Sequence, residues 1–496
     1  MSRSASWSLL SALALIGGAG PLAALDNYIV GPRAQGMGGT GVASSDDYTA
    51  QYYNPALFGF FGSAAGPDNQ GLAGKRWGVG FDASAGARIH GSLLDIAETL
   101  ADADIQGLSD DGIESREDIR ELLAAARALT QVGASGNAVS ADANAGVSVR
   151  FGHGAIGVRL FGQAATLVSN TDLQSVALDV AGAVLGQEIA DHGENDSQVL
   201  LLSDAQRDNL YAAFGGNGSF GTDAGATEAV LNLDYEMRQL GISQGQVQAV
   251  VEVVQNAAEA DPGTPRLEDN DTILRLRAFA LAEVPLSYGW AIGDHWSVGG
   301  SLKLMIGRVY GTELSVFDED APIRFDKTVD NYETTTTWGI DLAVAGRWDW
   351  IQVGAVGRNL NSPEFDGFTN AYGAKVAGVR VDPQVAVGVA VIPYRWLTVA
   401  LDADLLEGES SFPGYDTQRI GGGLEVNPWN ILALRAGVYQ NVAESDIGPV
   451  ITLGAGLNLW AMRIDLGVAS STDLTTLKDY DVPDEMRLSL GLTADF

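Results

Sequence analysis

The chain has 496 residues, of which 46% are hydrophobic and 62 are glycine, and its formal net charge is −34. Such a charge repels nucleic-acid phosphates, and the 29 lysines and arginines form no basic stripe, so we expect no nucleic-acid partner. The absence of cysteine excludes disulfides, thiolate metal sites and a lipid-modified N-terminal cysteine. We assign the acidity to solvated loops; bridging by calcium or by the cations of lipopolysaccharide is the alternative.

Residues 1–24 have the pattern of a secretory signal peptide. Arg3 supplies the positive charge, Leu9 to Ile16 forms a short apolar stretch, and small residues follow at Ala23 and Ala24. No later apolar run reaches the roughly 18 residues that a membrane helix needs. These features predict an exported protein and exclude a helical inner-membrane protein.

The end of the chain alternates between apolar and polar residues, which is typical of a membrane strand with one face toward lipid. The apolar face holds Met486, Leu488, Leu490, Leu492, Ala494 and Phe496, and the other face holds Arg487, Ser489, Gly491, Thr493 and Asp495. The terminal aromatic Phe496 resembles the sorting signal read by the outer-membrane barrel assembly machinery. We therefore expect that machinery as a partner, together with outer-membrane lipid and lipopolysaccharide.

The same alternation recurs along the chain and predicts about 14 antiparallel strands of an all-β transmembrane barrel. The expected strands are Trp77–His90, Val139–Phe151, Ile156–Val168, Leu274–Trp290, Trp296–Tyr310, Trp338–Arg347, Ile351–Leu360, Val385–Val391, Leu397–Leu405, Gln418–Val426, Ile431–Gln440, Ile451–Leu459, Met462–Ser470 and Met486–Phe496. Short turns then alternate with long loops, as in outer-membrane barrels. The long loops are residues 91–138, 170–271, 311–336, 361–383, 406–416, 441–448 and 471–485.

Tryptophans and charges agree with this barrel. Trp290, Trp296, Trp348, Trp350, Trp396, Trp429 and Trp460 flank the short turns, as an interfacial aromatic girdle requires. Charges fall on the rows opposite the lipid-facing ones, where a Lys or Arg near the midplane would cost about 2–4 kcal/mol. The lumen-facing charges are Arg275, Glu283, Lys303, Asp341, Asp402, Asp404, Glu425, Arg435, Arg463 and Asp465. We interpret them as ion pairs that brace the lumen, with an ion pathway as the alternative; these rows predict no apolar pocket.

Two long inserts show helical periodicity. Leu93–Ala128 includes Ser115 and Asp118 at capping-box spacing, and Thr227–Ala258 repeats its apolar residues in the same way. Topology places both inserts outside the cell. Capping or entering the barrel mouth is the alternative.

The segment before the first strand contains Gly36, Gly38, Gly39 and Gly41, which formally match a dinucleotide-binding fingerprint. We reject that reading, because no alternating strand precedes the glycines and no helix follows to hold a pyrophosphate.

Instead, the stretches Ala34–Ala43, Asp46–Asp47 and Tyr52–Ala56 resemble the N-terminal signature of FadL-like outer-membrane proteins. More narrowly, they resemble the relatives described as conjugal transfer protein TraF, as do Val284–Gly289, Val356–Pro363 and Arg435–Tyr439. The resemblance covers nearly the whole mature chain.

The resemblance implies a 14-stranded barrel over residues 76–496, with an N-terminal hatch over residues 25–75 that plugs the lumen while hydrophobic molecules pass through or leave sideways. Asn54 is expected to bond its own turn before Pro55, and glycines permit close approach to the wall. The hatch either gates the lumen or is a fixed plug.

Two functions follow from these expectations: a channel for hydrophobic or amphipathic small molecules, or a structural, secretion-associated component that uses its acidic loops and helical inserts. An enzyme is not expected, because His90, His153, His192 and His295 lie in no nucleophile motif, and no histidine pair has ligand spacing. No cofactor or metal is expected. Asp269 with Asp271, or Asp318 with Asp320, could hold calcium but lack an EF-hand loop.

Overall fold

The computed structural model describes residues 28–61, 77–102, 112–132, 137–176, 178, 181–258, 270, 272–315, 332–370, 375–409, 415–444, 446–459, 461–477 and 480–495. The expected signal peptide, Phe496 and the loop aspartates Asp269, Asp271, Asp318 and Asp320 lie outside these residues.

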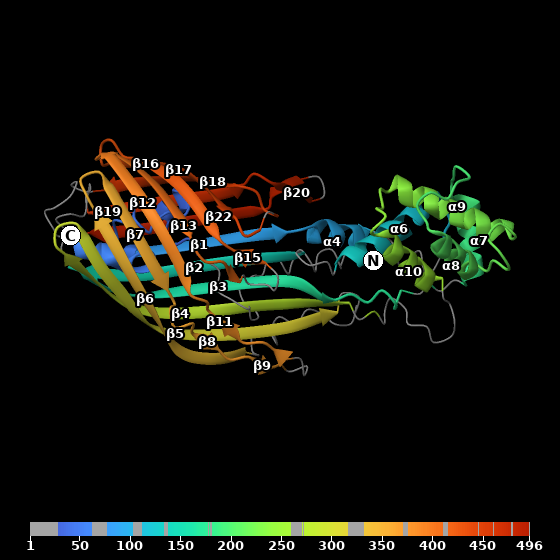
Figure 1. The fold of residues 1–496 in the computed structure, drawn as a ribbon, viewed down its shortest axis with the longest axis horizontal. Coiled ribbons are helices and arrows are strands. Elements are labelled where there is room, and N and C mark those ends of the chain that lie inside the picture. Colours follow the sequence, from blue (N-terminus) through green and yellow to red (C-terminus); the bar gives the residue numbers. More distant parts are fainter. Residues whose placement is uncertain are drawn as a thin grey trace.

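Fourteen antiparallel strands form a closed barrel (Figure 1). Each strand pairs with its neighbours in the chain, and β1 pairs with β22 from Gly78 opposite Asp495 to Arg88 opposite Glu485, which closes the barrel. The predicted number of strands and their antiparallel order are therefore confirmed. The barrel strands are β1 (Trp77–His90), β2 (Ala138–Phe151), β3 (Gly154–Asn170), β4 (Ile273–Ile292), β5 (Trp296–Ser315), β6 (Tyr332–Arg347), β7 (Ile351–Arg358), β12 (Gln384–Tyr394), β13 (Leu397–Asp404), β16 (Arg419–Val426), β17 (Leu432–Asn441), β18 (Val450–Leu459), β19 (Met462–Ser471) and β22 (Glu485–Asp495).

Strand boundaries depart from expectation in two instructive places. β6 begins at Tyr332 rather than at Trp338. The intervening Glu-Thr-Thr-Thr-Thr run has the β-branched residues that favour a strand, but it does not alternate between apolar and polar residues, so the alternation pattern missed it. β7 ends at Arg358 rather than Leu360, because Asn359 adopts a positive φ of 52° that ends the extended backbone.

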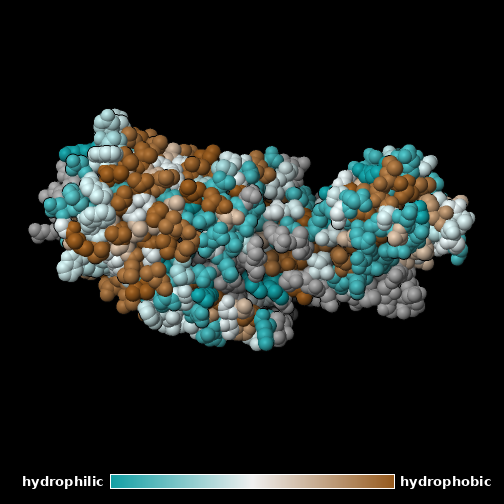
Figure 2. Space-filling view, in the orientation of Figure 1, coloured by the Kyte–Doolittle hydropathy of each residue, from teal (hydrophilic) through white to brown (hydrophobic). Residues whose placement is uncertain are grey.

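The outward rows of the barrel are apolar. Leu488 and Leu490 of β22 are about half exposed, as are Leu453 of β18 and Ile464 of β19. Figure 2 shows apolar side chains gathered in a band over the barrel, nearer the end with the short turns, while hydrophilic side chains cover the part next to the helices. Exposed tryptophans lie at that end, as the girdle requires: Trp77, Trp290, Trp296, Trp350, Trp396 and Trp429.

The described residues of the two long inserts form six helices: α4 (Leu93–Asp102), α6 (Arg116–Val132), α7 (Gly182–His192), α8 (Asp204–Ala213), α9 (Ala224–Gln239) and α10 (Val247–Ala257). Both stretches expected to be helical, Leu93–Ala128 and Thr227–Ala258, contain helices. Each insert forms separate helices, and α9 and α10 are divided around Gly241 at a positive φ of 66°. Helices α7 and α8 were not anticipated. The Ser115–Asp118 cap is present, since each side chain bonds the other residue's backbone N–H.

Helices α6–α10 form a body with its own hydrophobic core, which projects beyond the end of the barrel opposite the short turns (Figure 1). Glu236 is fully buried there between Arg116 and Arg120, at 2.5 and 2.9 Å. Among the described residues, no helix is both long and apolar enough to cross a membrane.

Short strand pairs decorate the loops at that end of the barrel. They are β8 (Glu364–Phe365) with β11 (Val379–Arg380), β9 (Phe368–Thr369) with β10 (Lys375–Val376), β14 (Gly408–Glu409) with β15 (Asp416–Thr417), and β20 (Leu474–Leu477) with β21 (Tyr480–Pro483).

Candidate functional site

Residues 28–61, the described part of the expected hatch, lie inside the barrel. They form α2 (Pro32–Gly36), α3 (Ala50–Tyr53) and the 3-10 helix η1 (Pro55–Phe60), and almost every residue is buried. α2 packs on β18 and β19, and η1 packs on β4 and β5, so the segment contacts opposite parts of the wall. The hatch therefore fills this level of the lumen.

The glycines of the hatch lie where backbones or rings approach closely. Gly38 has φ of 67°, and a Cβ there would be 2.4 Å from the carbonyl oxygen of Gly422 in β16. A Cβ on Gly41 would be 2.4 Å from Cγ of Tyr53. Gly36 lies against Gly454 of β18, and Gly39 lies beside the Arg419 side chain.

The Asn54 side chain joins two parts of the hatch to each other and to the barrel wall. Its Oδ1 accepts from the Ala56 N–H at 3.0 Å, which caps η1, and Pro55 occupies the first position of η1, where no N–H is needed. Its Nδ2 donates to the Val42 carbonyl at 2.9 Å and to the Val344 carbonyl of β6 at 3.2 Å. One fully buried amide thus serves three backbone groups.

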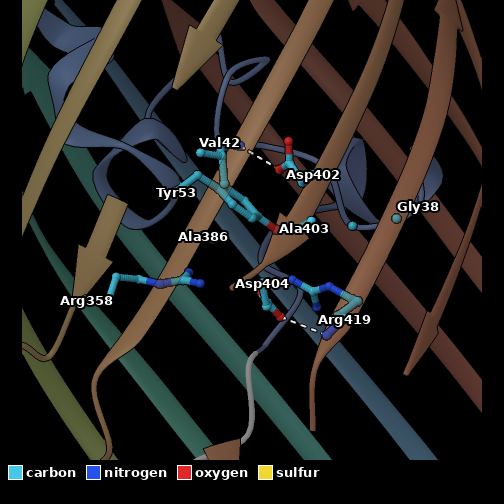
Figure 3. A pocket seen from close by; sticks show the side chains of 11 residues that line it. Gly38, Val42, Tyr53, Arg358, Ala386, Asp402, Ala403, Asp404 and Arg419 are labelled. Carbon is cyan, nitrogen blue, oxygen red and sulfur yellow. Dashed lines mark hydrogen bonds between the residues drawn. The ribbon is translucent and has the colours of Figure 1, made fainter. Parts of the chain in front are cut away.

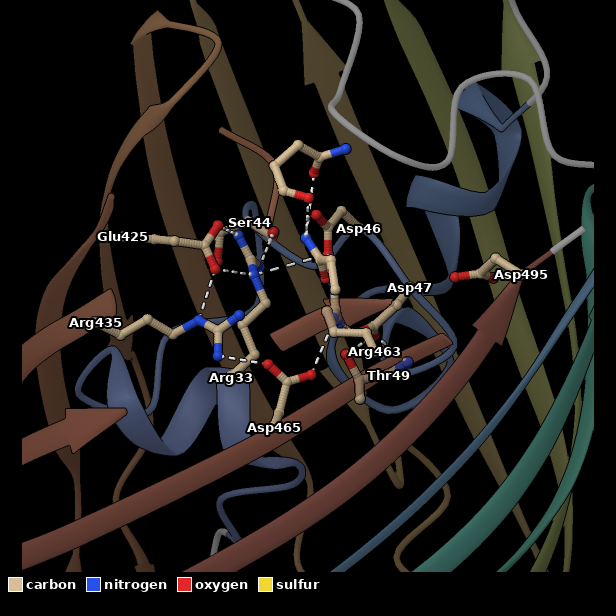
Figure 4. A network of polar contacts seen from close by, with 12 residues as sticks. Arg33, Ser44, Asp46, Asp47, Thr49, Glu425, Arg435, Arg463, Asp465 and Asp495 are labelled. Atoms are coloured by element: carbon tan, nitrogen blue, oxygen red, sulfur yellow. Dashed lines mark hydrogen bonds and ion pairs between the residues drawn. The ribbon is translucent and has the colours of Figure 1, made fainter. Parts of the chain in front are cut away.

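A chain of ion pairs joins the hatch to β16, β17 and β19 of the wall (Figure 4). Arg33 makes a two-pronged contact with Glu425 of β16 at 3.0 and 3.1 Å, and it also donates to the Ser44 carbonyl at 2.6 Å. Glu425 accepts from Arg435 of β17 at 2.6 Å, and Arg435 reaches Asp465 of β19 at 2.7 Å.

The chain of ion pairs returns to the hatch at its far end. Arg463 of β19 bonds Asp465 at 2.7 Å and also pairs with Asp47 of the hatch. Both ends of the network are therefore hatch residues, and the residues between them lie on strands of the barrel wall. Paired charges of alternating sign hold the segment in place, which favours bracing over an ion pathway.

Asp402 of β13 holds the backbone of the hatch directly (Figure 3). One carboxylate oxygen accepts from the N–H groups of Gly41 and Val42, at 2.6 and 2.8 Å. Next to it, Asp404 accepts from the backbone N–H of Arg419 at 3.0 Å. These residues line a cavity of about 10 Å³, which has room for about one water molecule.

The remaining predicted charges lie higher on the long strands. Lys303 of β5 contacts Asp341 of β6 at 3.0 Å, Glu283 of β4 at 3.6 Å and the side-chain oxygen of Asn359. This buried group braces neighbouring strands rather than the hatch. Arg275 lies eight residues before Glu283, near the loop end of β4, outside this cluster.

Apolar side chains pack together in the lumen above the hatch, so the inward rows are less polar there than expected. The 361–383 loop turns into the barrel, and its Phe365 packs edge-on against Phe279 of β4 with ring centroids 4.9 Å apart. Phe365 is 2% exposed. The surrounding apolar cluster includes Tyr28, Phe161, Leu281, Met305, Val309, Val379 and Val381.

Phe279 and Leu281 share the inward row of Arg275 and Glu283, so alternation alone places them in the lumen. The loop residue Phe365 that packs against them could not be placed in this way. Nor does any local pattern show that a loop returns into the lumen.

The hatch also completes a defect in the wall. The β3–β4 ladder pairs Ile156 with Leu286 and resumes only at Arg159 with Glu283, around Pro285, which has no N–H to donate. Gln51 of the hatch donates to the Pro285 carbonyl at 3.1 Å. Its own side-chain oxygen accepts from Ser148 of β2 at 2.6 Å.

The family model described as "F plasmid transfer operon, TraF, protein" matches residues 51–404. No curated protein matches the chain.

Similar solved structures include the toluene transporter TbuX of Ralstonia pickettii, with 12% identity, a TM-score of 0.44 and coverage of 95% of this chain and 99% of that one. The toluene transporter TodX of P. putida has 12% identity and a TM-score of 0.43 over 95% and 99%. A Pseudomonas aeruginosa FadL homologue has 10% identity and a TM-score of 0.42 over 96% and 100%.

Proposed function

This chain belongs to the TraF family matched by that model, and we propose that it is an outer-membrane barrel whose lumen admits small hydrophobic or amphipathic molecules. The outer membrane is the location that suits a closed barrel with an apolar outer band and an aromatic girdle, because a closed barrel leaves no unpaired strand edge in the lipid. The expected export signal agrees with that location.

The observation that carries the proposal is the buried apolar cluster above the hatch. Phe365, from the 361–383 loop, packs edge-on against Phe279 of β4 within this cluster, which also contains Phe161 and Val309. Such a site supports a ligand pocket that the protein closes with its own side chain, while the hatch closes the path beneath it.

Transport then requires the hatch to move, and a disulfide clamp tests this. A Cβ at Gly467 of β19 would lie 2.9 Å from the Cβ of Gln35 and 2.7 Å from the Pro32 carbonyl oxygen. A Gln35→Cys, Gly467→Cys pair therefore needs α2 to move by about 1 Å to reach the usual disulfide Cβ spacing of about 3.8 Å. Gln35 makes no side-chain hydrogen bond among the described residues, so its loss removes little. The chain has no cysteine to interfere.

We expect the oxidised clamp to block uptake into proteoliposomes of an amphipathic probe whose charge keeps it from crossing lipid, such as an alkyl sulfonate, and reduction to restore it in the same sample. A second variant, Phe365→Ala, should increase retention of toluene by the detergent-purified barrel. Uptake that is equal in the oxidised and reduced states would contradict a moving hatch. If Phe365→Ala and the native protein both retain no apolar ligand, the apolar cluster is not a binding site.

The second candidate is a structural or secretion-associated role, and the helical body favours it. Residues 112–132 and 172–258 carry 17 acidic and 5 basic side chains, an acidic surface suited to a basic partner. Asp172 and Asn270 lie side by side, with a hydrogen bond of 2.9 Å, so residues 173–269 can be replaced by a short linker. A channel should keep its uptake after this excision, whereas a docking component should lose its function in cells while the barrel still closes.

A further inference from the structure

A lysine and an asparagine meet inside the lumen across an intervening strand. Lys303 lies on β5 and Asn359 directly follows β7, yet Nζ of Lys303 donates to the side-chain oxygen of Asn359. Between them lies β6, where Gly339 is paired with Lys303 in the β5–β6 ladder. A Cβ on Gly339 would lie 3.0 Å from Cε of Lys303, so the glycine leaves the lysine side chain its path across β6.

The amide of Asn359 is held in one place by contacts with β6. The Asn359 backbone has a positive φ of 52°, and its N–H donates to Oδ1 of Asp341 at 2.8 Å. The N–H of Leu360 donates to the Ile340 carbonyl at 3.0 Å. A left-handed backbone is uncommon outside glycine and persists where the surrounding structure fixes it, often at functional sites. The side-chain amide is therefore preorganised beside Nζ of Lys303.

Two carboxylates share the ammonium group of Lys303. Asp341 of β6 lies 3.0 Å from Nζ, and Glu283 of β4 lies 3.6 Å from it. These three residues and Asn359 are each at most 5% exposed. Burial penalises charged groups, so the passage of one proton from the ammonium to a carboxylate, which leaves a neutral amine and a carboxylic acid, costs far less here than in water.

The contact also places the amine beside the carbon of the amide. That carbon, Cγ of Asn359, is one C=O bond of about 1.2 Å from the oxygen to which Nζ donates. The two atoms are therefore at roughly the separation of 3–3.5 Å from which reacting groups combine without further rearrangement. An unprotonated lysine amine is a nucleophile toward carbonyl carbon.

We propose that Lys303 and Asn359 form an autocatalytic isopeptide bond between Nζ and Cγ, with release of ammonia, and that Glu283 carries the protons of this reaction. The bond is a covalent strap from β5 to the end of β7 across β6. It does not rest on the proposed transport function, because it forms whether or not the hatch opens.

The reaction balances without a co-reactant. Glu283 takes one proton from the Lys303 ammonium, and the free amine attacks Cγ of Asn359, whose C=O electrons move onto Oδ1. Glu283 then gives its proton to the amide nitrogen, the bond from Cγ to that nitrogen breaks, and ammonia leaves as the C=O bond forms again. The new bond's nitrogen finally gives one proton to Glu283, which remains a carboxylic acid.

Burial favours the bonded state, and the position suits a strap. The reaction replaces a buried ammonium and a buried carboxylate with a neutral amide and a carboxylic acid. Asp341 keeps the nearby guanidinium of Arg358 as its counter-charge. The regular β6–β7 ladder ends at Leu342 opposite Gly357, so the strap fastens the wall where the pairing between these two strands stops.

The test is peptide mapping of the full native protein, purified in detergent. Trypsin does not cut after an acylated lysine, so we expect residues 278–308 to remain joined to residues 359–375, with a combined mass lower by one ammonia. The proposal is overturned if Lys303 is cleaved normally and the two peptides are separate. It is also overturned if the loss of ammonia maps to residues 359–375 alone, which would mean that Asn359 had cyclised onto its own backbone.

Variants then test the roles of the side chains. Lys303→Met removes the nucleophile, and Glu283→Gln keeps both reactants but removes the proton carrier, so each should yield separate peptides. Asn430→Ala is the matched control, because Asn430 has the same positive φ of 52° but its side-chain oxygen accepts from Asn458, and it should leave the linkage unchanged. Heat-dependent mobility on gels verifies that each variant is folded. Equal linkage in Glu283→Gln and the native protein would overturn the role of Glu283.

Discussion

Replacing Arg33 by methionine should loosen the hatch without unfolding the barrel. Arg33 is a buried cation held by Glu425 through two bonds of 3.0 and 3.1 Å, and by the Ser44 carbonyl at 2.6 Å. Breaking a buried ion pair costs about 3–5 kcal/mol. Because Glu425 keeps its 2.6 Å bond to Arg435, we expect the lower end of that range.

A cost of about 3 kcal/mol shifts the balance between the docked and released hatch by roughly 150-fold. Single-channel recording in planar bilayers measures this as open probability. The matched control is Arg380→Met, because Arg380 pairs with Asp382 at 3.3 Å on an exposed loop, where an ion pair contributes about 0–1 kcal/mol.

If Arg33→Met opens no more often than Arg380→Met, while both keep the heat-dependent mobility of a closed barrel, the ion-pair chain does not hold the hatch. That outcome would move the anchoring role to the contacts of η1 with β4 and β5. The Gln35–Gly467 clamp, introduced into the Arg33→Met background, should suppress any additional openings in its oxidised form.

Three further predictions concern single side chains. Asn54→Ala leaves three buried backbone groups without their partner, at about 1–3 kcal/mol for each unsatisfied group, and should speed amide exchange across the hatch. Gly41→Ala places a Cβ 2.4 Å from a ring carbon of the hatch and should destabilise its docking, whereas Gly162→Ala, with nothing within 4 Å, should be neutral in thermal unfolding. A hydrogen bond from Arg238 lowers the pKa of Asp196, so its stabilisation is present above the ordinary value of about 3.9 and is lost as pH falls through the lowered value; Asp196→Asn should flatten that acid dependence in circular dichroism of the helices.

The barrel was readable from the sequence because one physical rule repeats in every strand. Lipid on one side and a polar lumen on the other impose alternation, and the interface selects tryptophan beside the short turns. The rule fails where a strand extends beyond the lipid, as at the polar start of β6. It also says nothing of loop residues, so it could not place Phe365 against Phe279.

The site was readable only in part. Periodicity placed Glu425, Arg435 and Asp465 on the inward rows, and the structure pairs them. Their connection to the hatch could not be predicted, because Arg33 and Glu425 are 392 residues apart and meet only through closure. Likewise, no alternation pattern predicts α7 and α8 within their insert, because their apolar residues pack on the other helices of the body rather than on the barrel.

The pairing of β1 with β22 has a consequence for assembly. The hatch precedes the first strand in the chain, yet its α2 rests on β18 and β19, which are made almost last. A plug in such contact with late strands cannot acquire its seat until the ring is nearly complete. A chain truncated before β18 would therefore lack the seat of α2, so a docked hatch reports that β18 and β19 have joined the barrel.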